Sequence, residues 1–143
     1  MSDFPLEQLT PVAQTGVEVV SLRLQNLLLE NEDFSLIKID IEGAEDLIVD
    51  DLSILSEGRA AIWLSIHPPF IDDNINFLKS LLGHSNNFYF VNEDNQIISE
   101  EVLSERILST EKNPTWGTEW GNFFEIGLLP RKSFDSNGSR IKK

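Results

Sequence analysis

The chain has 143 residues, 41% of them hydrophobic, which predicts one globular domain with a sizeable core. It contains no cysteine, which excludes disulfides and thiolate metal sites. The net charge of −13 is uneven: residues 131–143 carry five basic side chains and one acid, a net +4, which leaves residues 1–130 at −17. An acidic surface of this kind repels nucleic acid and anionic membranes, so we expect neither as a partner.

The N-terminal residues are not expected to form regular structure. Residues 1–16 contain two prolines and a glycine and show little periodicity, so we interpret them as an irregular lead-in. They have neither the basic region nor the apolar stretch of a secretory signal, and no apolar run in the chain approaches the length of a membrane span. A cytoplasmic location is therefore the expectation.

The elements predicted after the lead-in alternate between strands and helices. Strands are expected where apolar and β-branched residues run together, and helices where apolar residues recur every three or four positions. The predicted strands are 17–22, 34–41, 60–66, 88–91, 96–98 and 122–129. The predicted helices are 24–29, 44–55, 75–82 and 100–108. Asp72 and Asp73 are suited to begin the third of these helices, and Gly83 to end it.

This alternation predicts a layered α/β domain. Residues 34–41 are almost continuously apolar, which is typical of a parallel strand covered on both faces. We expect this strand to run parallel to 60–66, joined to it by a right-handed crossover. Residues 132–143 are polar and basic with no apolar face, which predicts a disordered tail.

The most informative motif lies at the end of the strand 34–41. The run Lys38-Ile-Asp-Ile-Glu-Gly-Ala-Glu45 places the carboxylates of Asp40, Glu42 and Glu45 around Gly43. Burying an unpaired carboxylate inside a strand is costly, so these charges are expected just past its carboxyl end. Open α/β sheets bind their ligands at that end, and the motif therefore predicts a functional site.

The same run resembles the signature of FkbM-type S-adenosylmethionine-dependent methyltransferases, where it forms the fourth strand of a class I methyltransferase sheet. Ser65-Ile66-His67 stands where the family usually has Glu-x-His, and residues 122–130 resemble its closing strand. The resemblance covers residues 17–131. It implies a partial, Rossmann-like sheet with parallel strands, a C-terminal antiparallel strand pair and helices on the faces.

The sequence departs from the family pattern in three respects. Arg23 stands where the family usually has an acid, and Ser65 replaces the acid of Glu-x-His. The eight glycines include no Gly-x-Gly, and a glycine-rich turn is what class I methyltransferases use to hold the cofactor. The resemblance therefore implies only the C-terminal half of the domain, with S-adenosylmethionine bound in the complete one.

A missing N-terminal half has a consequence for partners. Without the preceding strands, residues 36–41 would form an open apolar edge, which is an aggregation hazard. We expect this edge to be covered by a chain that carries the missing half, by a second copy, or by residues 1–16.

The resemblance implies methyl transfer to a hydroxyl of a glycan, a lipid or a secondary metabolite. His67 follows a predicted strand and precedes two prolines. A neutral imidazole there can accept the hydroxyl proton, because the ordinary pKa of imidazole is close to neutral. Asp40 is expected to act beside it. The expected cofactor-binding residues are Asp40, Glu42 and Gly43, and the expected substrate-binding residues are Glu45, Trp116 and Trp120, the tryptophans as a stacking platform.

Each of these residues also has a structural interpretation. Asp40 could cap a helix beginning at Ala44, Glu42 and Glu45 could face the helix dipole, and His67 could be bonded into a tight turn. The two tryptophans could belong to a packed loop. Asp40, Glu42 and His67 could instead ligate Mg²⁺ or Mn²⁺. The alternative functions are a non-catalytic remnant or accessory binding module of the same fold, and a metal-dependent hydrolase or lyase.

Overall fold

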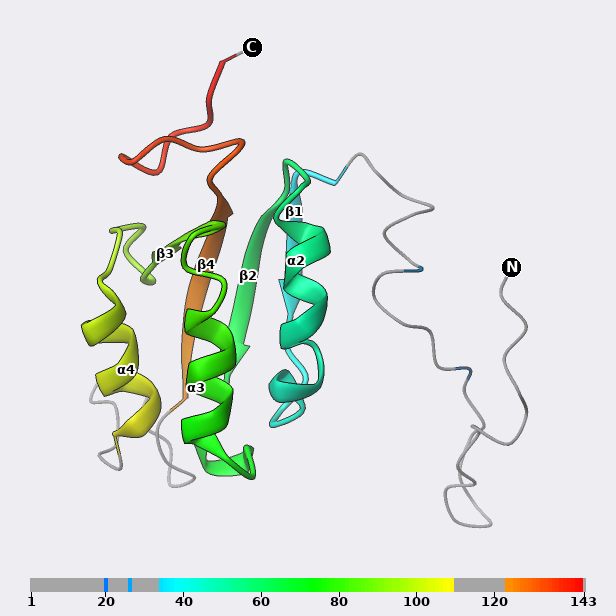
Figure 1. Ribbon diagram of the computed structural model, residues 1–143, viewed down its shortest axis with the longest axis vertical. Coiled ribbons are helices and arrows are strands. Elements are labelled where there is room, and N and C mark those ends of the chain that lie inside the picture. The colour runs from blue at the N-terminus through cyan, green and yellow to red at the C-terminus, as the bar shows by residue number, and fades with distance from the viewer. Residues whose placement is uncertain (1–19, 21–25, 27–33, 110–122, 143) are drawn as a thin grey trace.

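The computed structural model of the chain describes Val20, Asn26, residues 34–109 and residues 123–142. Within these ranges strands alternate with helices along the chain (Figure 1). The predicted strand 17–22, the predicted helix 24–29 and the expected lead-in 1–16 lie outside the described residues, apart from Val20 and Asn26. The fold is therefore that of residues 34–109 and 123–142.

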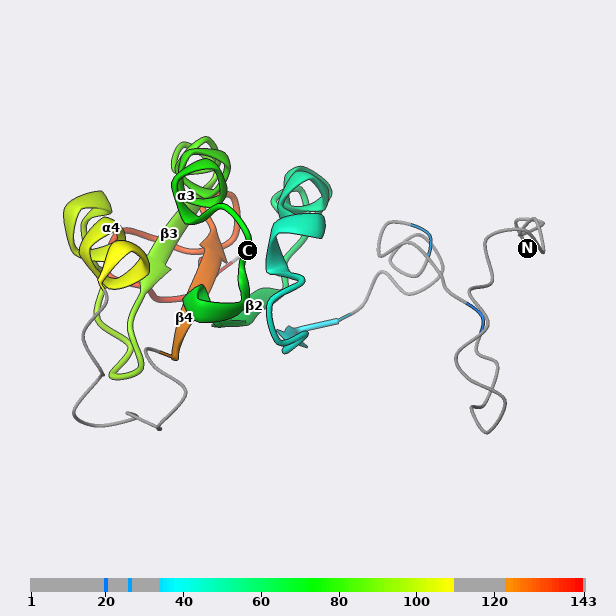
Figure 2. The same ribbon diagram turned by 90° about the horizontal axis from the view of Figure 1, so that it is seen from below.

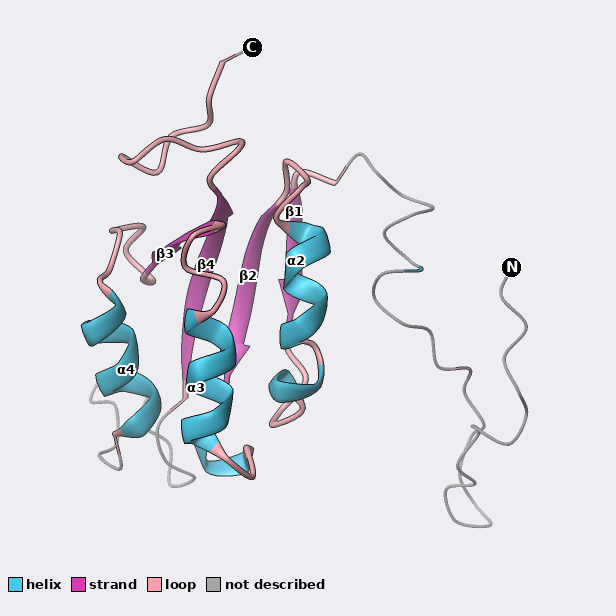
Figure 3. Ribbon diagram, viewed as in Figure 1, coloured by secondary structure: helices cyan, strands magenta, loops and turns pink. Residues whose placement is uncertain are grey.

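Within the described residues the sheet has four strands in the order β1-β2-β4-β3 (Figure 3). β1 (Leu36–Ile39) pairs in parallel with β2 (Ala61–Ile66), and β4 (Phe124–Pro130) lies antiparallel between β2 and β3 (Phe88–Val91). The α/β class, the parallel first pair and the antiparallel C-terminal pair are thereby confirmed. β1 is shorter than the predicted strand 34–41 and forms one edge of the sheet.

All described helices cover the same face of the sheet, so the expectation of helices on both faces is not met within the described residues (Figure 2). They are α2 (Leu52–Leu55), α3 (Asn74–Leu82) and α4 (Glu100–Leu108). Alternate side chains of the strands pack against them, since successive residues of a strand point to opposite faces. The buried core on this side includes Ile62, Leu64, Phe77, Phe88, Leu103, Phe124 and Ile126.

The opposite face of the sheet carries a smaller apolar cluster around Trp63. Trp63 lies across Gly127 of β4, where a Cβ atom would come within 2.9 Å of the indole, so only glycine leaves room for the ring. Val91, Leu129 and Phe134 complete the cluster with partly buried neighbours. β1 contributes Leu36 to this face, and its side chain is 61% exposed.

The C-terminal tail differs from the disordered tail predicted for 132–143. Phe134 is buried against the sheet, and it forms a bridge with Arg140. Between them the Asp135 carboxylate accepts hydrogen bonds from the amides of Asn137 and Ser139, which closes a turn. The prediction was wrong because the tail, although polar in overall composition, is held against the sheet by the buried Phe134.

The segment 44–55 is not the continuous α-helix that was predicted. Two 3₁₀ turns, η2 (Glu45–Leu47) and η3 (Val49–Asp51), precede the short α2. The buried apolar residues of this segment are Val49 in η3 and Leu52 and Leu55 in α2. Leu47, within the first of these turns, is 77% exposed.

The later elements agree closely with the predictions. The Asp73 side chain caps α3 by accepting the Asn76 amide at 3.0 Å, and the helix ends at Gly83. The Ser99 hydroxyl caps α4 in the same way. The predicted strand 96–98 is reduced to a single bridge between Ile97 and Val91.

Candidate functional site

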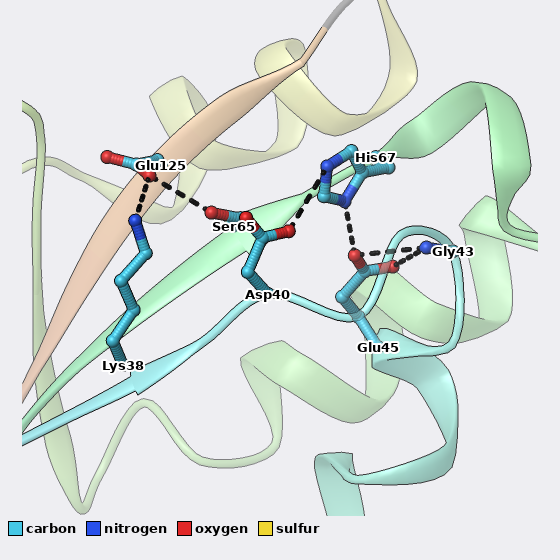
Figure 4. Close-up of polar contacts among 7 residues, drawn as sticks. All are labelled: Lys38, Asp40, Gly43, Glu45, Ser65, His67 and Glu125. Carbon is cyan, nitrogen blue, oxygen red and sulfur yellow. Dashed lines mark hydrogen bonds and ion pairs between the residues drawn. The ribbon is translucent and has the colours of Figure 1, made fainter.

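The candidate site lies where β1 and β2 end side by side. Ile39 is paired with Leu64 in the parallel register, so the residues that follow the two strands emerge at the same edge of the sheet. Asp40 Oδ1 lies 3.6 Å from His67 Nε2, as Figure 4 shows. The structure therefore brings together the two residues that were expected to act together.

Glu45 is the second carboxylate of the site and contacts the other side of the imidazole ring. Its side chain is fully buried, and Oε1 lies 2.5 Å from His67 Nδ1. This position differs from the substrate contact expected for Glu45, because a carboxylate that is not accessible can act only through its neighbours. His67 is 12% exposed and Asp40 48%, so the ring bridges a buried carboxylate and a half-exposed one.

Gly43 holds the buried carboxylate in place. Its backbone N–H donates to both Glu45 oxygens, at 3.1 and 2.9 Å. Gly43 has φ +100°, and an added Cβ would lie 2.5 Å from Cβ of Phe70. Glu42, just before it, also has a positive φ of 47°. Two successive left-handed residues turn the chain sharply after β1, and this turn allows Glu45 to reach back toward His67.

The hydrogen-bond chemistry assigns the proton on His67. An ionised carboxylate only accepts hydrogen bonds, and Glu45 already accepts the Gly43 N–H. With Glu45 ionised, the Nδ1–H of His67 is the donor to Glu45, and Nε2 of the neutral ring is then unprotonated. Nε2 is the atom that faces Asp40, beyond hydrogen-bond distance.

Two aromatic rings flank His67. The Phe70 ring is stacked with it at a centroid distance of 6.4 Å, and the Phe123 ring meets it edge-on at 5.0 Å. η4 (Pro68–Phe70) carries Phe70 and directly follows His67. Asn74 Nδ2 donates to the Pro68 carbonyl at 2.8 Å, which anchors this turn to the start of α3. Phe70 was not predicted as a site residue.

The remaining predicted residues have different outcomes. Asp40 does not cap a helix, because the first turn of η2 has no side-chain cap. Glu42 is exposed, and its predicted contact with the cofactor stays a prediction. Trp116 and Trp120 lie outside the described residues.

A polar network that the sequence did not predict lies beside the site, on the face of the sheet opposite α2, α3 and α4. Glu125 of β4 is paired with Ser65 of β2 and accepts its hydroxyl at 3.0 Å. It also accepts the Trp63 indole N–H at 2.7 Å and the Lys38 ammonium at 3.2 Å. Glu125 thus places a carboxylate against Ser65, the residue that replaces the acid of the Glu-x-His pattern. The sequence contained one indication of this network, a glutamate within the apolar run 123–129. A charged side chain in such a run needs hydrogen-bond or ion-pair partners.

The charge of this glutamate is stabilised by its partners. Partial burial on its own raises the pKa of Glu125. The three hydrogen bonds and the positive charge of Lys38 outweigh that effect, so the pKa of Glu125 is lowered from its ordinary value.

The expected metal alternative is not supported by the geometry. Among the described residues, no group of three histidine, aspartate or glutamate side chains is arranged to hold a metal ion. The alternative ligand set of Asp40, Glu42 and His67 lies within these residues and is therefore not such a group. No described helix is long and apolar enough to cross a membrane.

Comparisons with protein-family models, with curated proteins and with solved structures found no match to this chain.

Proposed function

We propose that this chain carries the C-terminal half of an FkbM-like methyltransferase domain that methylates a hydroxyl oxygen. The observation that carries the proposal is the bridging of His67 between Glu45 and Asp40 at the carboxyl ends of two parallel strands. The antiparallel closing strand β4 supports it as well, since the resemblance implies an antiparallel C-terminal pair.

His67 is the proton acceptor in this proposal. Its Nδ1–H is donated to the buried Glu45, which fixes the ring and leaves Nε2 free to take the proton of the acceptor hydroxyl. The ring becomes positively charged as it does so. The carboxylates of Glu45 and Asp40, 2.5 and 3.6 Å from its nitrogens, stabilise that charge. Glu45 is a positioning residue here, and Asp40 is accessible to substrate.

The acidic residues at the end of β1 are suited to bind one part of S-adenosylmethionine. S-adenosylmethionine supplies the electrophilic methyl group in the complete domain. The carboxylates of Asp40 and Glu42 are both exposed at the strand end and suit the ammonium group of the amino-acid end. No Gly-x-Gly occurs in the 143 residues, so in this proposal the rest of the cofactor is held by residues outside them. The missing N-terminal half, or a partner that supplies it, belongs to the proposal.

The second candidate, an accessory binding module without catalysis, is favoured by that same missing turn. The two candidates share the fold and differ in whether the strand ends contact the cofactor. The metal-dependent hydrolase has no such supporting observation.

A nuclear magnetic resonance titration of the whole chain with S-adenosylmethionine tests the proposal. We expect saturable amide shifts confined to residues 40–45, His67 and Phe70, with a dissociation constant of about 1 mM because these residues would contact only one part of the cofactor. Asp40→Asn should weaken binding, and Asp46→Asn, a substitution at an exposed acid of the neighbouring turn, should leave it unchanged. Micromolar affinity would identify a cofactor site complete in this chain.

The absence of any localised shift would contradict the methyltransferase proposal and favour the accessory module. Equal weakening by both substitutions would mean that the overall negative charge, rather than Asp40, attracts the cofactor.

A further inference from the structure

The C-terminal tail forms a hollow at the end of the sheet opposite the candidate site. β2 runs from Ala61 to Ile66 and His67 follows its far end, whereas the tail folds back over its beginning (Figure 1). The Ser133 hydroxyl donates to the Gly58 carbonyl at 3.2 Å, and the Ile141 amide donates to the Ser133 carbonyl at 2.9 Å. These bonds join the tail to the loop before β2 and enclose the hollow between them.

Three cationic side chains surround this hollow. Its volume is about 210 Å³, and its lining consists of Arg59, Lys132, Ser133, Arg140 and Ile141. Pockets for drug-sized ligands start at roughly 300 Å³, so this one suits a single small group rather than a whole large ligand. No acidic side chain is part of the lining, in a chain whose net charge is −13.

Arg140 is held in place before any ligand arrives. Its guanidinium lies over the Phe134 ring at 4.6 Å, and it donates to the carbonyls of Arg59 at 2.7 Å and Ser35 at 3.3 Å. These bonds use two of its five N–H donors, so the remaining ones stay available. An ordered guanidinium loses little conformational entropy when it binds an anion.

The other two cations differ in their partners. Lys132 is paired with Glu57, and both side chains are largely exposed. The Arg59 guanidinium has no hydrogen bond or ion pair with the described part of the chain, and its backbone carbonyl is the group that contacts Arg140. Three positive charges and the one negative charge of Glu57 leave a net +2 at the hollow.

We propose that this hollow binds the phosphoryl group of a small anionic molecule. A phosphate monoester carries a charge of about −1.5 to −2 at neutral pH, which matches the local +2. Guanidinium groups recognise its oxygens with paired N–H donors, and a lysine adds a point charge. The site is independent of the proposed methyltransfer, because it lies at the other end of β2 and shares no residue with the Glu45–His67–Asp40 group.

The test is a titration of the whole chain with sodium phosphate at constant ionic strength, followed by amide shifts in nuclear magnetic resonance. We expect saturable shifts at Gly58, Ser133 and Ile141, and no such shifts with sodium chloride. Arg59→Gln should weaken phosphate binding about tenfold, which corresponds to 1.4 kcal/mol. Lys79→Gln, at an exposed lysine in the last turn of α3, removes the same charge elsewhere and should change the affinity less than about twofold.

Arg59→Gln is the informative variant because the backbone carbonyl, rather than the side chain, supports Arg140. The amide spectrum of the sheet residues should be the same in Arg59→Gln as in the wild type, which would show that the variant is folded. Shifts that do not saturate, shifts reproduced by chloride, or equal weakening by Arg59→Gln and Lys79→Gln would overturn the proposal.

Discussion

Gly43 determines the backbone turn that carries Glu45 under His67. Its φ of +100° is a conformation that other residues rarely adopt, and the space where a Cβ would project is filled by Cβ and the carbonyl of Phe70. The backbone atoms of Phe70 cannot move aside as the tip of a flexible side chain can. A larger residue must therefore displace either the turn after β1 or the turn after β2, which carries His67.

Gly43→Ala is predicted to lower the free energy of unfolding by about 2 kcal/mol, from the strained φ and the close contact combined. Chemical denaturation of both proteins measures this difference. Gly58→Ala is the matched control: Gly58 has no positive φ, the nearest atom to an added Cβ would be 3.5 Å away, and its substitution should change stability by less than about 0.5 kcal/mol. Equal effects of the two substitutions would show that the turn tolerates a side chain.

At the scale of the elements, one carboxylate joins three strands. Glu125 of β4 accepts hydrogen bonds from Trp63 and Ser65 of β2 and from Lys38 of β1. These partners stabilise its ionised form, and the pKa of Glu125 is lowered in the folded protein. Stability that depends on a lowered pKa is complete above the pKa of the unfolded chain and is lost as the pH falls through the folded value.

Glu125→Gln is therefore predicted to destabilise the protein more at pH 7 than at pH 3. The difference should begin to shrink below about pH 5, since glutamate in an unfolded chain titrates near pH 4.3. Urea unfolding of both proteins between pH 3 and pH 7 measures it. Glu105→Gln, at an exposed position of α4, should show no comparable pH dependence. A Glu125→Gln effect that is constant with pH would contradict the lowered pKa.

The elements that were predicted correctly depend on local signals. Asp73 and Ser99 cap their helices through bonds to residues three positions away, and such bonds are encoded in neighbouring residues. The segment 44–55 was predicted wrongly because its conformation depends on tertiary contacts. Glu45 bonds the Gly43 backbone and the His67 ring, and no sequence pattern within the segment encodes the contact with His67.

The proximity of Asp40 and His67 was predictable, because it follows from the direction of the strands that precede them. Asp40 and His67 each follow a strand, and the carboxyl ends of parallel strands meet at one edge. The place of Glu125 was not predictable in this way, because it depends on the antiparallel register that sets it opposite Ser65. The burial of Glu45 depends on two left-handed residues, of which only Gly43 is evident from sequence.

At the scale of the whole molecule, β1 is an edge strand of the sheet that the described residues form, and its side chain Leu36, on the face opposite the helices, is 61% exposed. Edge strands with apolar side chains pair readily with other chains. The methyltransferase proposal requires a neighbour on this side, either a chain with the missing half or a second copy. Coverage by residues 1–16 is the remaining alternative.

We predict that the chain associates through β1 as its concentration rises. Light scattering coupled to size-exclusion chromatography should show a dimer or larger species, and Leu36→Lys should weaken this association about tenfold by placing a charge on the edge. Leu47→Lys, at another exposed leucine away from the strands, is the control and should have no effect. A monomer at all concentrations, with rapid hydrogen exchange throughout β1, would contradict the prediction.

The central claim is that Glu45 fixes the proton of neutral His67 on Nδ1 and leaves Nε2 as the acceptor. The ¹⁵N chemical shifts of the imidazole nitrogens, recorded above the pH at which the ring becomes neutral, measure this tautomer directly. The described residues give His84 no carboxylate partner, so its ring serves as an internal reference. We predict that His67 is protonated at Nδ1 and that Glu45→Gln weakens this preference. A neutral His67 protonated at Nε2 in the wild-type chain would contradict the account.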